Sequence, residues 1–319
     1  MLLVVPAAAQ DTVTVVGPTG GQTKVTGRIV DYRSGRLQLE MLGGHRKEIP
    51  GEQIVQIDTQ YGPEKIEADA LFAAGRFAEA VDSYDRARGG ESRRWVQRQI
   101  TAQMVRCYRA IDRPDRAGNE FLGLILEDPN TPYFDCIPLA WMSRQPSPHL
   151  EEAARAWLIR DEPAAVLLGA SHLLGTSSRS DALRRLRNLT LGSDRQIAPL
   201  ALAQTWRAEI ATAGVERIDT WDPLIEKLPE SLAAGPYFVL GQARLRQQQW
   251  ESAALAMLRV AILYPDQREL AAQALLEAGR ALEMLDRTEE ALRLYRELIK
   301  KYPAQERAVA EAKAKMNYE

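Results

Sequence analysis

The sequence predicts a mainly α protein, in which helix-turn-helix units stack into a solenoid after a small all-β module. Three observations predict this class. From residue 64 to the end, apolar residues recur at spacings of three and four, which is the period of a helix with one buried face. Before residue 60 they alternate with polar residues, as in half-buried strands. A similar unit of two helices returns several times, which indicates internal repeats.

The β module is expected to span residues 11–60. Alternation predicts strands at 12–16, 24–30, 36–41 and 54–57, with turn signals such as Gly43-Gly44 between them. We expect a closed barrel, because closure removes exposed strand edges. The order of the segments VTGRIVDY, GRLQLEM and KEIPGEQIVQI resembles an SH3-like or Sm-like barrel.

The clearest helical unit runs from Ala272 to Pro303. Its first helix carries the small residue Gly279, and its second carries Ala291 and then Tyr295 before Pro303 ends it. Small residues let two helices approach closely, and the aromatic ring fills the space between them. This pattern resembles the tetratricopeptide repeat (TPR) family. The resemblance implies a right-handed superhelix that binds proteins.

Related units make residues 61–319 a TPR-like helical repeat domain. Their second helices carry Ala80, Ala117 and Ala253, each followed four residues later by Tyr84, Phe121 or Met257. The region between 129 and 230 is irregular by comparison. The polar helix 306–316 suits a cap on the last repeat.

A proline-rich segment, 129–148, interrupts the repeats. Its apolar residues include Leu139 and Trp141, which must be buried somewhere. A plug between repeats is favoured over a ligand clamp, because scattered aromatic residues usually pack in the core. The role of the segment is left open.

Residues 1–10, MLLVVPAAAQ, resemble the remnant of a secretory signal peptide, with an apolar run and a small-residue cleavage site. This resemblance predicts an extracytoplasmic location, the periplasm or cell envelope of a bacterium. Cys107 and Cys136 are the two cysteines. They either form a disulfide after export or stay as buried thiols in separate segments.

Nothing in the sequence indicates catalysis or a cofactor. The three histidines, His45, His149 and His172, lie in different segments, and no metal-binding spacing is present. No Gly-x-Ser-x-Gly motif indicates a hydrolase. The formal net charge of -2 exerts no general attraction on nucleic acid or anionic lipid. We therefore expect no enzyme, no cofactor and no metal.

The favoured function is a protein-interaction scaffold that binds a peptide or protein segment in the concave groove, which the first helix of each repeat lines. An arginine-lined groove could hold an acidic segment by paired hydrogen bonds. The candidate groove residues are Arg106, Arg109, Gln242, Arg246, Arg280 and Glu283.

Two alternatives remain. An RNA-associated cytoplasmic adaptor would use the Sm-like barrel, although acidic residues among its basic ones oppose phosphate binding. A hydrolase hidden in the irregular middle is the third hypothesis. The partner and the oligomeric state cannot be predicted from the sequence.

Overall fold

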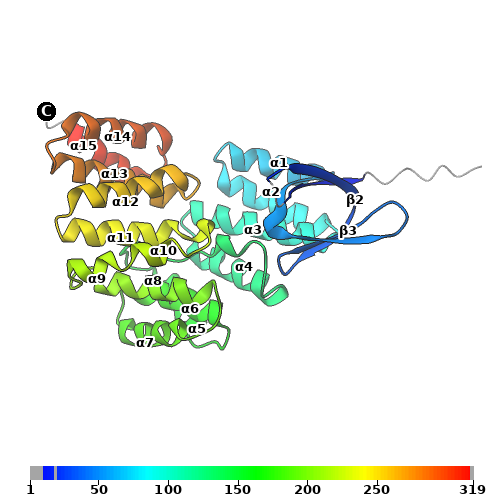
Figure 1. Cartoon of the computed structure of the whole chain (residues 1–319), viewed down its shortest axis with the longest axis horizontal. Coiled ribbons are helices and arrows are strands. Elements are labelled where there is room, and N and C mark those ends of the chain that lie inside the picture. The colour runs from blue at the N-terminus through cyan, green and yellow to red at the C-terminus, as the bar shows by residue number, and fades with distance from the viewer. Residues whose placement is uncertain (1–9, 18–19, 317–319) are drawn as a thin grey trace, which may run out of the picture. The chain divides into compact units, whose positions relative to one another are not determined.

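The computed structural model describes residues 10–17 and 20–316 (Figure 1). The chain folds as two compact units, residues 1–138 and residues 139–319. Helices dominate both, which confirms the prediction of a mainly α, TPR-like solenoid preceded by a β module. The signal-peptide prediction concerns residues 1–9, outside the described part. The sequence also predicts a domain boundary between the β module, residues 11–60, and the repeat domain, residues 61–319. This boundary stays a prediction.

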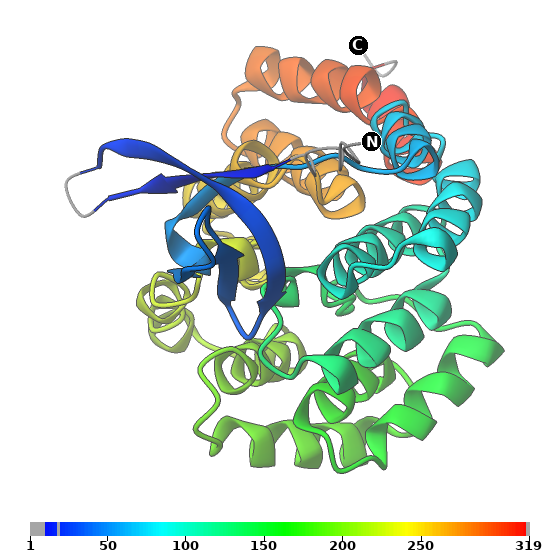
Figure 2. The same ribbon diagram turned by 90° about the vertical axis from the view of Figure 1, so that its right-hand side faces the viewer.

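The β module is one antiparallel sheet with the strand order β4-β3-β2-β1-β5. Figure 2 shows the long β2 ribbon curving through it. The register of β2 against β3 shifts between Ile29 and Asp31, and a Cβ at Gly27 would come within 2.5 Å of the Glu40 carbonyl oxygen on β3. The strands are β1 (Asp11–Val16), β2 (Gln22–Arg33), β3 (Arg36–Glu40), β4 (Arg46–Pro50) and β5 (Ile54–Asp58).

The sheet is not closed, so the predicted closed barrel is wrong. The edge strands β4 and β5 each pair with one neighbour, and within the described residues they do not pair with each other. The apolar face is covered by helices instead. Val13 and Leu37 of the sheet share one buried cluster with Ala68 and Trp95 of the first helices. Burial by a second layer makes closure unnecessary for the core.

Two buried charges join the sheet to the helices of the first unit. Arg98, 2% exposed, forms ion pairs with Asp31 on β2 and with Glu127. Asp128, fully buried, accepts hydrogen bonds from the main-chain nitrogen and the hydroxyl of Ser34 at 3.0 Å and 3.1 Å. The helices of this unit are α1 (Pro63–Ala73), α2 (Phe77–Gly90), α3 (Arg94–Ala110) and α4 (Pro114–Glu127).

The second unit is itself a stack of helices. Figure 1 shows α11 to α14 lying one above another. Its helices are α5 (Pro148–Leu158), α6 (Pro163–Leu173), α7 (Arg179–Thr190), α8 (Ile197–Glu209), α9 (Val215–Asp219), α10 (Asp222–Ile225), α11 (Ala234–Arg246), α12 (Trp250–Leu263), α13 (Arg268–Glu283), α14 (Thr288–Lys301) and α15 (Glu306–Met316). The last of these has the bounds predicted for the capping helix.

Four helix pairs share the same turn, which confirms the repeats predicted around their alanines. Each turn contains one residue with φ between 55° and 75°, in the left-handed region. The next residue donates its main-chain N–H to the carbonyl five positions earlier, as Arg287 does to Leu282 at 3.0 Å. This bond caps the first helix. The left-handed residues are Gly75, Asp112, Gln248 and Asp286.

An ion pair stabilises the start of α14. Thr288 is the first residue of the helix, and no side chain caps it. Arg287 precedes it and donates two hydrogen bonds to Glu290, at 2.7 Å and 2.6 Å.

In the second unit the helices form two rows. Helices α6, α8, α11, α13 and α15 contact each other successively, and we call them the inner row. Helices α7, α12 and α14 pack against them from outside and form the outer row. Almost every residue of α6 and all of residues 234–241 of α11 are buried, which explains why these two stretches are apolar on all sides.

Candidate functional site

The structure places four of the six predicted groove residues on adjoining inner-row helices. Gln242 and Arg246 lie one turn apart on α11, half-buried and exposed respectively. Arg280 and Glu283 lie on α13, which packs against α11. The tertiary structure thus places these four residues on one row of helices, and their role in binding stays a prediction.

The predicted residues on α13 already have internal partners. Arg280 donates to Glu277 at 3.0 Å and to Glu311 of α15 at 2.6 Å. Glu283 accepts from Lys315 of α15 at 2.6 Å. An acidic ligand at Arg280 would therefore replace a carboxylate rather than meet an unpaired cation.

Arg106 and Arg109 lie in the first unit, on α3. Arg106 donates to Asp135 at 2.9 Å and to Gln103 at 3.3 Å. Arg109 is half-buried on the same helix. Because Asp135 belongs to the segment after α4, Arg106 ties that segment to α3.

The segment 139–146, which we call the linker strand, forms neither helix nor β-strand, bends at Met142 and is held on the inner row. Ala140 donates its main-chain N–H to the hydroxyl of Ser171 on α6 at 3.2 Å and accepts from the Gln204 side chain on α8 at 3.0 Å. The Met142 carbonyl accepts from Arg207 of α8 at 3.0 Å. The side chains of Ser171, Gln204 and Arg207 therefore bind main-chain atoms of this segment, so these contacts do not depend on its side chains.

The binding side chains form one buried polar cluster. Arg207 donates to the Ser171 carbonyl and to the Gln204 side-chain oxygen, both at 2.7 Å. Burial lowers the pKa of Arg207 to about 10, and the nearby cation Arg179 acts in the same direction. The guanidinium stays charged at neutral pH, so it is a strong donor to carbonyl oxygens.

Two side chains anchor the linker strand. Leu139 and Trp141 are 6% and 9% exposed. Trp141 lies against Gly235 of α11, where an added Cβ would come within 1.9 Å of the ring. Arg144 then forms an ion pair with Glu269 of α13 at 3.5 Å. Sequence reasoning recognised that these apolar residues are buried but not which helices receive them.

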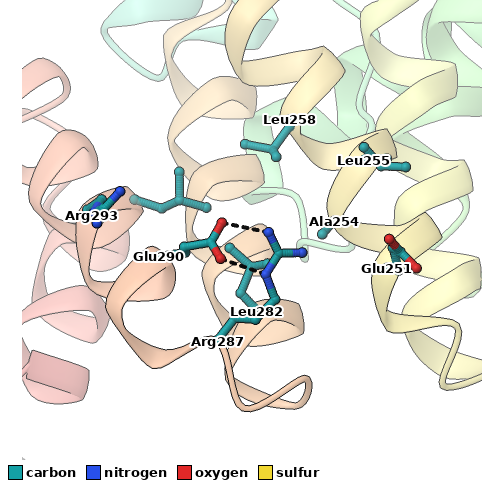
Figure 3. Close-up of a pocket in the computed structure, with 9 residues that line it drawn as sticks. Glu251, Ala254, Leu255, Leu258, Leu282, Arg287, Glu290 and Arg293 are labelled. Carbon is teal, nitrogen blue, oxygen red and sulfur yellow. Dashed lines mark hydrogen bonds and ion pairs between the residues drawn. The ribbon is translucent and has the colours of Figure 1, made fainter.

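A second surface, which sequence reasoning missed, is a pocket in the outer row (Figure 3). It measures about 240 Å³ and lies between α12 and α14. Ala254, Leu255 and Leu258 line it from α12, together with Leu282 and Leu294. Figure 3 shows the Arg287–Glu290 pair at its rim. The signal in the sequence was the stretch 253–263 of α12, which is apolar at every position except Arg259.

The titratable clusters and the two cysteines of the described residues bear on metal binding and thiol chemistry. No group of three or more His, Cys, Asp or Glu side chains in this part of the chain could hold a metal ion. Cys107 and Cys136 are buried thiols and form no disulfide. Burial raises the pKa of each to about 12, so neither is a nucleophile at neutral pH. Among the described helices, none is long and apolar enough to cross a membrane.

Residues 273–304 match the sequence pattern of the tetratricopeptide repeat family. The match begins in α13 and ends just after α14, within the unit that the sequence showed most clearly. No curated protein matches the chain. Solved structures that match include the assembly chaperone of RpL4 (Acl4), residues 1–338, which is 14% identical with a TM-score of 0.35. That match covers 80% of this chain and 95% of the other.

Proposed function

We propose that the protein is a non-enzymatic interaction scaffold that binds an extended segment of a partner protein on its inner row. One observation carries this proposal: the inner row holds the linker strand through side chains that bind main-chain atoms. Such contacts accept any extended chain. The TPR match at residues 273–304 supports protein binding on the same row.

The binding region would continue past the linker strand, over α11, α13 and α15. Gln242 and Arg246 supply an amide and a guanidinium there. Arg280 can exchange one of its two carboxylate partners for an acidic group of the ligand. Such an exchange adds little desolvation penalty, because the guanidinium keeps a charged partner throughout.

A photo-crosslinking amino acid at position 246 tests the proposal in the native cell. We expect a specific crosslink to one protein, which mass spectrometry identifies and nuclease treatment leaves unchanged. The same amino acid at Arg187, an exposed residue of the outer-row helix α7, serves as the control. Arg246→Glu should lower recovery of the partner at least tenfold. No crosslink at 246, or an equal one at 187, would reject the inner row as the binding surface.

We further propose the cell envelope as the location, on the resemblance of residues 1–10 to a signal remnant. Fractionation followed by mass spectrometry of the N-terminus tests this point. An intact Met1 in the cytosolic fraction would contradict export. Cleavage after Ala9 in a periplasmic fraction is the expected result.

The SH3-like or Sm-like character of the sheet is also a proposal. The strand order β5-β1-β2-β3-β4 and the bent β2 support it. The RNA-associated alternative gains no such support, because basic side chains of the sheet have acidic neighbours. Arg28 pairs with Glu40 at 2.6 Å and Arg36 with Glu48 at 3.5 Å. Each pair weakens the positive field that phosphate binding requires.

A further inference from the structure

Helix α12 exposes apolar side chains that a helix of a folded unit normally buries. Leu255 is 59% exposed and Ile262 68%. Together with the half-buried Leu258 they follow one another at spacings of three and four, so they form a single stripe along the helix. A continuous exposed stripe of this kind, rather than a scattered leucine, indicates an interaction surface.

The stripe is one wall of the outer-row pocket, and α14 is the other (Figure 3). The pocket of about 240 Å³ is smaller than the roughly 300–1,000 Å³ typical of cofactor and drug sites. It suits one or two aliphatic side chains. With Ile262 further along α12, the surface extends over about two helical turns, since each turn rises about 5.4 Å.

The chemistry of the walls favours a helix over an extended strand as the ligand. Both walls are helices, whose main-chain groups already bond within the helix. The polar side chains of the rim are paired as well, Arg287 with Glu290 and Arg293 with Glu289. An extended peptide would leave its own N–H and C=O groups without partners here. A helix satisfies these groups internally and presents only side chains.

The exposed side of α14 carries a row of positively charged side chains. Arg293, Arg296 and Lys300 are exposed and recur at spacings of three and four along it. Arg293 is held only loosely, at 3.8 Å from a Glu289 side chain that is 90% exposed. Within the described residues Arg296 and Lys300 form no ion pair. This wall therefore complements a helix with acidic residues beside its apolar face.

The α12 wall carries the opposite charge at one end. Glu251 lines the pocket near the start of α12 and lies in the field of Arg287. The two walls thus differ. On α12, Arg259 is paired with Asp222 at 3.0 Å, so Glu251 is the charge at the pocket. On α14, Glu290 and Glu297 are paired with Arg287 and Lys301, which leaves Arg296 and Lys300 as the excess cations. A ligand helix would place its acidic flank over α14 and its apolar face against Leu255 and Leu258.

We propose that the groove between α12 and α14 is a second interaction site, which binds an amphipathic helix of a partner protein with an acidic flank. Its apolar anchors would recur at spacings of three and four. The site lies on the outer row and is independent of the inner-row function proposed above. A scaffold with both sites could hold an extended segment and a helix at the same time.

Fluorescence anisotropy with a synthetic probe tests the site on the full chain. The probe is a labelled 18-residue peptide with leucines at positions i, i+3, i+4 and i+7 and glutamates on one flank. We expect it to bind at least tenfold more tightly than the same peptide with lysines in place of the glutamates. A scrambled peptide of equal composition should not bind measurably.

Matched variants locate the binding. Leu255→Asp should lower the affinity for the glutamate peptide at least tenfold. Leu263→Asp, on the same helix at 53% exposure but outside the pocket, should change its affinity less than twofold. Arg293→Glu combined with Arg296→Glu should invert the preference between the two peptides. Circular dichroism checks that each variant is folded.

Several results would overturn the proposal. Equal affinity for the glutamate and scrambled peptides would do so, as would an unchanged affinity of Leu255→Asp. If the parent protein sediments as a dimer and the Leu255→Asp variant as a monomer, the groove binds a second copy of the chain instead. Binding to vesicles of phosphatidylcholine and phosphatidylglycerol that Leu255→Asp abolishes would assign it to a membrane. Arg246→Glu should leave peptide binding unchanged, which separates this test from that of the inner row.

Discussion

At the scale of single residues, small side chains set how closely paired helices approach. Gly169 on α6 faces the backbone of α5, where an added Cβ would come within 2.5 Å of the Ala154 carbonyl oxygen. Gly241 faces the Met257 side chain instead, at 2.8 Å. A thioether chain can move aside, whereas a helix backbone cannot move without shifting the whole helix.

Gly169→Ala should therefore destabilise the protein by about 1–3 kcal/mol, because overpacking outweighs the better helix propensity of alanine. Gly123→Ala is the control. Gly123 is exposed in α4 with no atom within 4 Å of its added Cβ, so that change should stabilise by up to about 1 kcal/mol. Urea unfolding followed by circular dichroism measures both. Equal effects of the two substitutions would contradict the close approach.

The buried thiols predict a reactivity pattern and a pH dependence. Because burial raises the pKa of Cys107 and Cys136 to about 12, neither should react with maleimide in the native protein at pH 8. Both should react in urea. The unfolded thiols ionise from about pH 9 while the native ones stay protonated, so unfolding becomes easier as pH rises from about 9 to 12. Below pH 9 the thiols are protonated in both the native and the unfolded state, so their effect on the free energy of unfolding does not change there with pH. Labelling of either thiol in the native state would contradict its burial.

At the scale of elements, the sheet and the first helices depend on a charged joint. The guanidinium of Arg98 on α3 is buried between carboxylates of β2 and the end of α4, and it also donates to the Tyr32 carbonyl at 3.1 Å. Asp31 and Glu127 are 33% and 39% exposed, so solvent screens part of the attraction. The joint positions β2 against the helices more specifically than apolar contact alone would.

Arg98→Met should cost about 2–3 kcal/mol, less than the 3–5 kcal/mol of a fully buried pair, because water can still reach both carboxylates. Arg94→Met is the matched control. Arg94 lies one turn earlier on α3, is 79% exposed and is 3.9 Å from the same Glu127, so its loss should cost under about 1 kcal/mol. Urea denaturation of both variants tests the difference. Similar midpoints would show that the joint adds no stability.

At the scale of the whole molecule, the linker strand connects three inner-row helices of the second unit by packing against all of them. It touches α6, α8 and α11, which lie far apart in the chain. Solenoid repeats normally contact only their neighbours. A segment that crosses several of them adds cooperativity that the stacked repeats alone would lack.

Trp141→Ala should cost about 3–5 kcal/mol, as for other buried aromatic residues. Amide hydrogen exchange should then accelerate in α6, α8 and α11 and stay unchanged in α1 to α4 of the other unit. Ser143→Ala, an exposed position of the same strand, should stay within about 0.5 kcal/mol of the parent. Uniform acceleration across the chain would contradict a local role for the strand.

Local patterns determined most of the architecture. Helix periodicity and the alanine-aromatic pairs were sufficient to predict the repeats. The reason is that each second helix buries its alanine completely, as at Ala80 and Ala291. Strand alternation was sufficient for the β module, since a period of two sorts residues onto two faces. The sequence by itself also determined that the apolar residues near Trp141 are buried. The six candidate groove residues that it suggested, Arg106, Arg109, Gln242, Arg246, Arg280 and Glu283, stay a prediction.

Only the tertiary structure decided how these elements meet. Closure of the sheet depended on whether helices cover its apolar face, which is a long-range contact with no local signature. One of the two carboxylate partners of Arg280 is Glu311 of α15, a helix beyond α14 in the chain, so the charge available to a ligand could not be predicted from spacing within α13. The pocket beside Leu255 exists because α12 and α14 stand side by side. Periodicity reports which face of a helix is apolar, but neighbours across space decide whether that face is covered.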